Sequence, residues 1–145
     1  MQRTLIIGAS GQIGKKLTQK MVDAGLPVSA LVRDKEKLSD LEGNSLKVVE
    51  ADLLENFEHA YEECDKVIFV AGSGGDTGAD KTLMIDLWAA CKAVDYAKRH
   101  DIKHFIMVSS IGADSPSDGP SEMQPYLVAK HMADEHLIYS GVPHT

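Results

Sequence analysis

Apolar and polar residues follow two different periods along this chain. Five short apolar runs rich in β-branched residues cover residues 4–7, 28–32, 46–49, 66–70 and 104–108. Runs of this length are typical of strands buried on both faces of a parallel sheet. The segments between them carry apolar residues every three or four positions, which is the period of an amphipathic helix. The alternation predicts an α/β fold, with helices in a doubly wound, three-layer arrangement around a mostly parallel sheet of five strands.

Two predicted helices show a clear apolar stripe that we expect to face the sheet. The stripe of the first helix contains Ile13, Leu17, Met21 and Ala24. Gly25 and Pro27 follow it and are typical of a helix end. The stripe of the helix between the fourth and fifth runs contains Leu83, Leu87, Ala90, Cys91, Val94 and Ala97.

Three glycines spaced three residues apart close the first apolar run, in the segment Gly8-Ala9-Ser10-Gly11-Gln12-Ile13-Gly14. Between a first strand and a first helix, such glycines allow a sharp turn, a close backbone approach to phosphate and tight packing of the helix on the sheet. The free N–H groups that begin the helix favour an anion. We therefore predict a dinucleotide pyrophosphate site formed by Gly8, Ser10, Gly11, Gln12, Ile13 and Gly14.

Two irregular segments follow the fourth and fifth runs. Residues 71–78 are rich in glycine, and residues 112–124 are rich in Ser, Pro, Asp and Gly. Both are expected at the carboxyl edge of the sheet, where ligands bind in folds of this kind, although flexible connectors are the alternative. Ala71 and Gly72 are small enough for the backbone to pass close to a cofactor.

Composition narrows the class of protein. The 145 residues suit one domain, 1–145, and 15 Lys and Arg against 22 Asp and Glu give a formal net charge of −7. We expect neither nucleic acid nor an anionic membrane as a partner. Because no apolar stretch reaches the roughly 18 residues of a membrane span and the start does not resemble a signal peptide, we expect a cytoplasmic protein. Cys64 and Cys91 are expected to be reduced thiols, and the histidines lack metal-ligand spacing, so no metal site is expected.

Tyr126 and Lys130 are four residues apart, which places them on one face of a helix about one turn apart. A lysine cation near the phenol favours phenolate, and the same ammonium can hydrogen-bond a ribose hydroxyl. Packing plus a solvated charge is the alternative for this pair. The pair follows a strand that ends in Ser109 and Ser110, where a hydroxyl can bind a substrate carbonyl oxygen.

The glycine loop, the two serines and the Tyr126–Lys130 pair together resemble the short-chain dehydrogenase/reductase superfamily. The glycine spacing is that of its extended and atypical branches. The segment 71–75, Asp80-Lys81-Thr82 and Asp86 are similar to the atypical NAD(P)-binding group related to epimerase/dehydratases. This resemblance covers essentially the whole chain and implies a Rossmann-like domain.

The resemblance also implies roles for individual residues. Ser110, rather than Ser109, would orient the substrate, Tyr126 would be the acid/base and Lys130 its partner and a cofactor ligand. The usual fourth member is an asparagine, and Asp86 stands at the matching position. A plain helix-face carboxylate is the alternative for Asp86.

The end of the second strand bears on the choice between NADP and NAD. Arg33 can pair with a 2′-phosphate, whereas an acidic residue such as Asp34 can accept hydrogen bonds from an unphosphorylated ribose or cap the next helix. Because Arg33 comes first, and similar family members carry arginine there, NADP(H) is favoured over NAD(H). Asp52 and Leu53 resemble the family's adenine-binding pair, with a loop aspartate as the alternative for Asp52.

Family members of this type continue into a sixth strand beyond the position of Thr145 and then into a substrate-binding region. We therefore expect the chain to be the amino-terminal, cofactor-binding part of a longer family-type protein, with the sixth strand truncated. The fifth strand would be an exposed edge through which a homodimer could form.

The favoured function is an NADP(H)-binding oxidoreductase-like protein that transfers a hydride to or from a carbonyl or alcohol, or performs epimerase/dehydratase chemistry, on a small-molecule substrate that the sequence does not identify. One alternative is a non-catalytic NAD(P)H sensor or regulatory module. Another is a flavin or quinone reductase-like activity.

Overall fold

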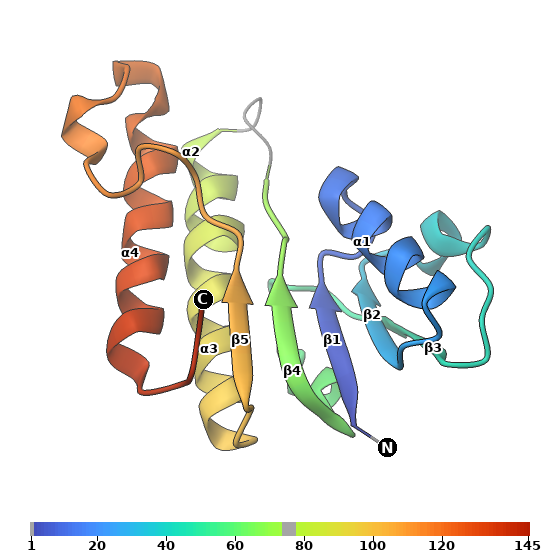
Figure 1. Ribbon diagram of the computed structural model, residues 1–145. Helices are drawn as coiled ribbons and strands as arrows, with labels where there is room; N and C mark the ends of the chain where they lie inside the picture. The colour runs from blue at the N-terminus through green and yellow to red at the C-terminus, as the bar shows by residue number, and fades with distance from the viewer. Residues whose placement is uncertain (1, 74–77) are drawn as a thin grey trace.

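Five parallel strands form one sheet in this computed structural model, which describes residues 2–73 and 78–145 (Figure 1). The strands are β1 (Arg3–Ile7), β2 (Val28–Val32), β3 (Leu46–Glu50), β4 (Cys64–Phe69) and β5 (His104–Met107). Their order across the sheet is β3-β2-β1-β4-β5, and every neighbouring pair is parallel. The predicted doubly wound parallel sheet is therefore confirmed.

The direction of winding reverses between β1 and β4, which lie side by side at the centre of the sheet. In the register of this pair, Ile7 is opposite Phe69, so both strands end at the same height. The loops that follow them consequently separate at the carboxyl edge, which is where doubly wound sheets bind ligands.

Helices cover the sheet on both faces. The helix α1 (Gln12–Asp23) and the single turn η1 (Lys35–Leu38) belong to one face. The other face carries η2 (Glu58–Tyr61), the helix α4 (Gln124–Ser140) and one long helix made of α2 (Ala79–Lys81), η3 (Thr82–Ala89) and α3 (Ala90–Arg99). Two further single turns, η4 (Pro116–Asp118) and η5 (Ser121–Met123), lie between β5 and α4. In Figure 1 the long helix and α4 run antiparallel to the strands.

The core has two parts because successive strand residues point to opposite faces of the sheet. Leu5 and Ile7 belong to the cluster under α3 and α4, whereas Ile6 belongs to the cluster under α1. All three side chains are fully buried. Burial on both faces explains why β1 and β2 appear in the sequence as nearly continuous apolar runs.

The inward face of the long helix differs from the predicted stripe in its first half. Leu83 is 56% exposed, whereas Thr82 and Asp86 are buried. The reason is that residues 82–89 form a π-helix, whose i→i+5 hydrogen bonds widen the turn and change which residues face inward. From Ala90 onward the helix is α-helical, and Val94 and Ala97 are buried as predicted.

The first helix also departs from its predicted stripe at two positions. Ile13 is 56% exposed, and Ala24 is exposed and lies just beyond the last residue of α1, whereas Gly14 and Thr18 are buried against the sheet. Leu17 and Met21 are half-buried and pack on the core as predicted. The inward face begins at Gly14 because only a residue without a side chain fits so close to the first loop.

Residues 143–145 run beside β5. The amides of Phe105 and Met107 donate to the carbonyls of Pro143 and Thr145 at 2.8 and 3.0 Å, and the Thr145 amide donates to Phe105 at 3.0 Å. His144 is paired with Phe105 in a parallel bridge. The expected open edge of β5 is therefore wrong over these residues, because this segment satisfies its backbone hydrogen bonds as the beginning of a sixth parallel strand.

Candidate dinucleotide site at the carboxyl edge of the sheet

The glycine loop leaves β1 at Gly8, which has a positive φ of +90°. A Cβ built on Gly8 would lie 2.5 Å from the Cα of Ala71, in the loop after β4. A Cβ on Gly14 would overlap the carbonyl oxygen of Gly8. Both glycines are therefore required by the packing of the chain itself, as the sequence predicted.

Gly11 differs from its two partners. A Cβ on Gly11 would meet only the Gly8 carbonyl oxygen, at an ordinary contact distance of 3.5 Å, and its φ of −72° suits any residue. The packing of the chain therefore does not require glycine at Gly11, unlike at Gly8 and Gly14. The absence of a Cβ leaves room for a phosphate to come close to the backbone, which is the role that the sequence predicts for this glycine.

The glycine loop leads directly into α1, whose first turn faces the open space beside Gly11. Gly11 is the N-cap residue and provides no side-chain cap, and no acidic residue lies in the first turn. The first N–H groups of an α-helix have no partner within it, and the helix dipole makes this end partly positive. Ser10 is half-buried, and Gln12 and Ile13 are exposed. The open cradle and the uncapped amides fit the pyrophosphate of a dinucleotide.

Arg33 and Asp34 follow β2 and are both exposed. The Asp34 side chain accepts a hydrogen bond from the Glu36 amide at 3.0 Å and caps η1, which is the simpler of the two roles weighed for it. Within residues 2–73 and 78–145, the Arg33 guanidinium makes neither a hydrogen bond nor an ion pair. Arg33 is therefore available to an anionic ligand, whereas Asp34 is already used.

Asp52 and Leu53 follow β3. The Asp52 carboxylate accepts a hydrogen bond from the Leu54 amide at 2.9 Å, which is a local turn, and its side chain is otherwise exposed. Leu53 packs on the core, and its carbonyl accepts a hydrogen bond from Lys92 at 2.9 Å. The pair lies at the carboxyl edge of β3, beside the end of β2.

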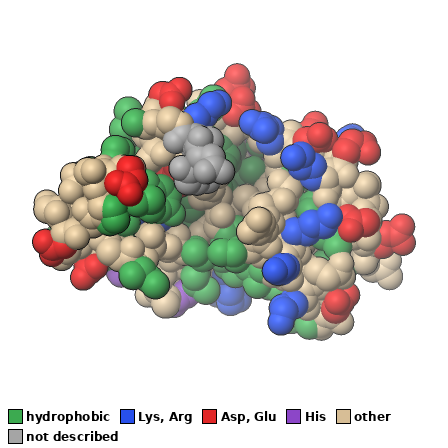
Figure 2. All heavy atoms as spheres, turned by 90° about the horizontal axis from the view of Figure 1, so that it is seen from above, with side chains coloured by type: hydrophobic (Ala, Val, Ile, Leu, Met, Phe, Trp, Pro, Cys, Tyr) green, Lys and Arg blue, Asp and Glu red, His purple; other side chains and the backbone are tan. Residues whose placement is uncertain are grey.

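Basic and acidic side chains alternate over one half of this edge. Figure 2 shows the molecule from above Figure 1, with Lys and Arg interspersed with Asp and Glu on the side of α1 and β2. Exposed basic residues of α1 and of the segment after β2 are Lys16, Lys20, Arg33, Lys35 and Lys37, and the exposed Asp34 and Glu36 lie between the last three.

The two serines after β5 have different surroundings. Ser109 donates a hydrogen bond of 2.5 Å to Asp134 on α4, so its hydroxyl is engaged. The Ser110 hydroxyl makes only a long contact, 3.3 Å, with the carbonyl of Ile111 and lies beside Tyr126. This arrangement fits the preference for Ser110 over Ser109 as the hydroxyl that faces a substrate.

Tyr126 lies in the first turn of α4 and is half-buried. Burial raises the pKa of the Tyr126 phenol, the nearby Asp86 carboxylate raises it further, and the Ser110 hydroxyl opposes both. The expected stabilisation of phenolate by lysine is not the dominant effect here. The phenol is held in its protonated form, which suits a proton donor.

Lys130 is 2% exposed, one turn after Tyr126. Its ammonium donates a hydrogen bond of 2.8 Å to the carbonyl of Val108, which fixes the side chain at the end of β5. Burial lowers the pKa of Lys130, while Asp86 and Asp134 oppose that change. Lys130 is therefore a buried group rather than the solvated surface charge that was its alternative, and the bond to Val108 uses one of its three N–H donors.

Asp86 lies on η3 and is 1% exposed. Its Oδ2 accepts hydrogen bonds from the hydroxyl and the amide of Ser73, at 2.5 and 3.3 Å. Its Oδ1 is buried and has no hydrogen-bond partner within the described residues. A Cβ on Gly72 would lie 3.1 Å from this Oδ1. Asp86 is therefore not the exposed helix-face carboxylate that was its alternative.

Three residues that contact the predicted site residues Asp86 or Ser109, directly or through Ser73, were not predicted as functional residues from the sequence: Ser73, Thr82 and Asp134. The Ser73 hydroxyl donates a hydrogen bond to the Asp86 carboxylate and also lies 3.4 Å from the Thr82 hydroxyl. The four-residue spacing of Thr82 and Asp86 was a detectable signal, since it places two polar residues on one side of an otherwise apolar helical segment. Gly74 and Gly75, which contributed to the resemblance, lie outside the described residues.

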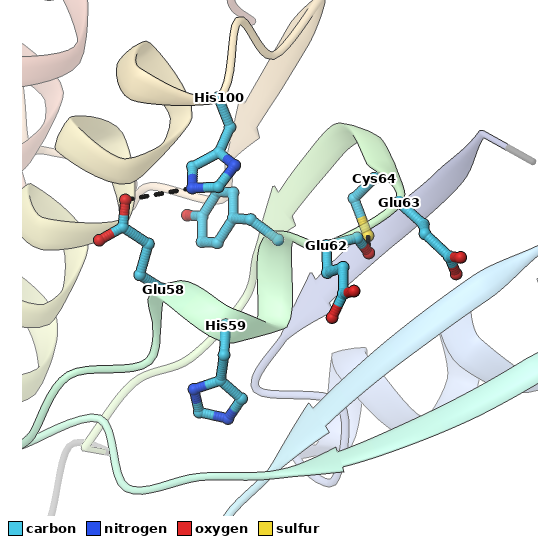
Figure 3. Close-up of a pocket in the computed structure, with 7 residues that line it drawn as sticks. Glu58, His59, Glu62, Glu63, Cys64 and His100 are labelled. Atoms are coloured by element: carbon cyan, nitrogen blue, oxygen red, sulfur yellow. Dashed lines mark hydrogen bonds and ion pairs between the residues drawn. The ribbon is translucent and has the colours of Figure 1, made fainter.

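A separate hollow lies at the opposite, amino-terminal edge of the sheet. It has a volume of about 520 Å³ and is lined by η2, the start of β4 and His100. Figure 3 shows the His100 ring turned toward Glu58, with Cys64 on the far side of the hollow. Glu58 binds Arg99 through two contacts of 3.0 Å and His100 at 3.1 Å. Arg99 and His100 lower the pKa of Glu58, so this carboxylate is already matched by its own neighbours.

Within residues 2–73 and 78–145, no group of three or more His, Cys, Asp or Glu side chains is arranged to hold a metal ion. No helix in that part of the chain is long and apolar enough to cross a membrane.

The fold and the cradle at its carboxyl edge define a dinucleotide-binding α/β domain. Comparison with known proteins agrees, because the model of the NAD(P)H-binding family matches residues 8–145. The chain belongs to this family, and its resemblance to atypical short-chain dehydrogenase/reductases and epimerase/dehydratases is confirmed.

Individual relatives support the same assignment. The uncharacterized sugar epimerase YhfK of Bacillus subtilis is 42% identical over 99% of this chain and 69% of its own length. A solved structure from Bacillus halodurans, assigned as an NAD-dependent epimerase/dehydratase, is 43% identical with a TM-score of 0.92, over 99% of this chain and 68% of that one. The oxidoreductase ylbE from Lactococcus lactis is 26% identical with a TM-score of 0.85, over 99% and 66%. The chain thus spans about two thirds of the length of these relatives.

Proposed function

We propose that this protein is an NADP(H)-dependent oxidoreductase that acts on a carbonyl or alcohol carbon, directly or within an epimerase/dehydratase cycle. The observation that carries the proposal is the placement of Ser110, Tyr126 and Lys130. All three lie at the carboxyl end of β5, on the same edge of the sheet as the glycine cradle. They come from two elements, so the fold rather than local sequence brings them together.

The preference for NADP(H) rests on Arg33. Its guanidinium is exposed and has no partner among the described residues, whereas the neighbouring Asp34 carboxylate caps η1. A guanidinium can bind a phosphate through two parallel hydrogen bonds, which makes it suitable for a ribose 2′-phosphate.

NADP(H), when bound, supplies or accepts a hydride. Within this proposal the Ser110 hydroxyl donates a hydrogen bond to the substrate oxygen and orients it beside Tyr126. During reduction, the Tyr126 phenol donates its proton to that oxygen, and during oxidation the phenolate takes the proton back. Burial and the Asp86 charge raise the pKa of Tyr126, so the phenol is the form that enters the proposed reduction. Lys130 is anchored to Val108 by one of its N–H groups, and in this proposal a remaining N–H group binds the cofactor.

The proposal is tested by adding NADPH and a panel of aldehydes, ketones, quinones and nucleotide-linked sugars, and following the nicotinamide absorbance. Tyr126→Phe should abolish turnover without weakening NADPH binding, and Ser110→Ala should reduce turnover strongly. Tyr139→Phe is the matched control, because Tyr139 is an exposed residue near the other end of α4. Because an epimerase regenerates its cofactor, sugar products should also be separated and identified.

Two outcomes would contradict the proposal. Turnover that is unchanged in Tyr126→Phe would exclude this tyrosine as the proton donor. NADPH binding without any turnover across the panel would instead favour a non-catalytic sensor or regulatory module.

A further inference from the structure

Asp86 connects two parts of the site that are far apart in the chain. From η3 it contacts Ser73, in the loop after β4, and its charge acts on both Tyr126 and Lys130 of α4. The carboxylate is 1% exposed, and both neighbouring segments approach it from the carboxyl edge. A buried charge of this kind requires hydrogen-bond donors, because burial without them is costly.

The contacts of Asp86 are concentrated on a single oxygen. Oδ2 accepts from the Ser73 hydroxyl and amide, and the same hydroxyl lies 3.4 Å from that of Thr82. Thr82 is also buried, one wide helical turn before Asp86. The side chains of Thr82 and Asp86, both on η3, therefore contact Ser73 from the same side.

Holding Ser73 also determines where the preceding residue lies. The bare Cα of Gly72 is packed so near Asp86 that a Cβ would stand 3.1 Å from Oδ1. Ala71, one residue earlier, lies against Gly8 of the pyrophosphate cradle. The chain from Ala71 to Ser73 is thus fixed at one end by the glycine loop and at the other by Asp86.

We propose that Asp86 is a positioning residue that acts through Ser73, holding the backbone of residues 71–73 against the dinucleotide site, and that it is not a member of a proton relay. This role rests on the proposed binding of NADP(H). Its chemical basis is the acceptor oxygen rather than the negative charge, because Ser73 donates both hydrogen bonds. An amide oxygen at the same place accepts the same two bonds.

The anchor is tested first in the ligand-free protein by hydrogen exchange of the Ser73 amide, which donates to Asp86. Asp86→Ala and Ser73→Ala should increase the exchange rate of the amide at this position, by about tenfold for Asp86→Ala, because the loss of hydrogen bonds to the Asp86 acceptor opens the loop locally. Asp86→Asn should leave it near the rate of the unchanged protein. Asp95→Ala is the matched control, since Asp95 pairs with His136 on the outside of α3.

The second measurement compares the affinities for NADPH and for adenosine 2′,5′-bisphosphate, which lacks the nicotinamide half. Asp86→Ala should weaken NADPH binding about tenfold and leave the affinity for the bisphosphate unchanged, because residues 71–73 lie at the end of β4 rather than beside Arg33. Asp86→Asn should restore NADPH affinity to within about twofold. A general loss of stability would weaken both ligands together, so the ratio of the two affinities separates positioning from folding.

The outcomes distinguish this inference from the proposed function. If the unchanged protein does not bind NADPH, the proposed function fails, and the exchange measurement still decides whether Asp86 anchors the loop. If NADPH binds but its affinity is unchanged in Asp86→Ala, or if Asp86→Asn loses as much affinity as Asp86→Ala, the positioning role is overturned. Unchanged exchange of the Ser73 amide in Asp86→Ala would overturn the anchor itself.

Discussion

Gly8 lies against Ala71 so closely that a Cβ on Gly8 would stand 2.5 Å from the Ala71 Cα. This contact joins the loops after β1 and β4, the two strands between which the winding of the sheet reverses. Backbone packing between Gly8 and Ala71 therefore sets the distance between the glycine loop and the loop after β4. The loop geometry belongs to the fold and does not depend on a bound ligand.

Gly8→Ala is expected to destabilise the protein by more than about 2 kcal/mol, because it combines a positive φ with a backbone collision. Gly11→Ala should cost less than about 1 kcal/mol, since its Cβ meets an ordinary contact. Urea denaturation of both variants measures the difference. Equal stability of the two variants would contradict the distinction drawn between these glycines.

Arg33→Ala should lower the affinity for NADPH by about tenfold or more and leave that for NADH nearly unchanged, because only NADPH carries the 2′-phosphate. Calorimetric titration of both cofactors measures the effect. Lys37→Ala is the control, since Lys37 is an exposed cation in the neighbouring turn η1. An equal loss for the two cofactors in Arg33→Ala would show that the arginine does not recognise the phosphate.

Asp86→Asn should lower the pKa of Tyr126. Burial and the Asp86 charge both raise that pKa above 10.0, and the substitution removes only the charge. Carbon NMR of ring-labelled tyrosine across an alkaline titration measures the pKa, with Tyr126→Phe to assign the signal. A pKa that rises or stays constant in Asp86→Asn would contradict the electrostatic description of the site.

The Cys91 thiol should react slowly with iodoacetamide in the folded protein. Burial, with a smaller effect from Asp95, raises its pKa from 9.0 to about 11, so the reactive thiolate is about a hundredfold rarer near neutral pH than in the unfolded chain. Because the unfolded thiol loses its proton first, this group contributes stability that is present below pH 9 and is lost as the pH rises toward 11. Mass spectrometry of labelled peptides provides the rates. Labelling of folded Cys91 at the unfolded rate would contradict this picture.

The strands β1, β2 and β4 could be predicted from the sequence because they are buried over most of their length and therefore leave nearly continuous apolar runs. Burial does not explain the run at β3, an edge strand whose residues are exposed or half-buried. The buried face of the long helix could be predicted only in part. The α-helical period places Leu83 on that face, but the π-helical turns of residues 82–89 move Thr82 and Asp86 inward and leave Leu83 exposed. Periodicity alone does not reveal such a change of period.

The candidate site shows the same division between local and tertiary information. The glycine spacing and the Tyr126–Lys130 pair are local, so they were visible in the sequence. The bond between Asp86 and Ser73 and the placement of Lys130 on Val108 depend on how η3 and α4 pack against the ends of β4 and β5. No pattern within either helix contains that information.

Calorimetric titration of NADPH into the unchanged protein and into Gly11→Ala tests whether the open space at Gly11 receives a dinucleotide pyrophosphate. The unchanged protein should bind NADPH, and more tightly than NADH. Gly11→Ala should remain folded but bind NADPH at least about tenfold more weakly, since the added Cβ occupies the path of the phosphates. Equal NADPH affinity in the two proteins, or no binding by the unchanged protein, would contradict the assignment of the pyrophosphate to this loop.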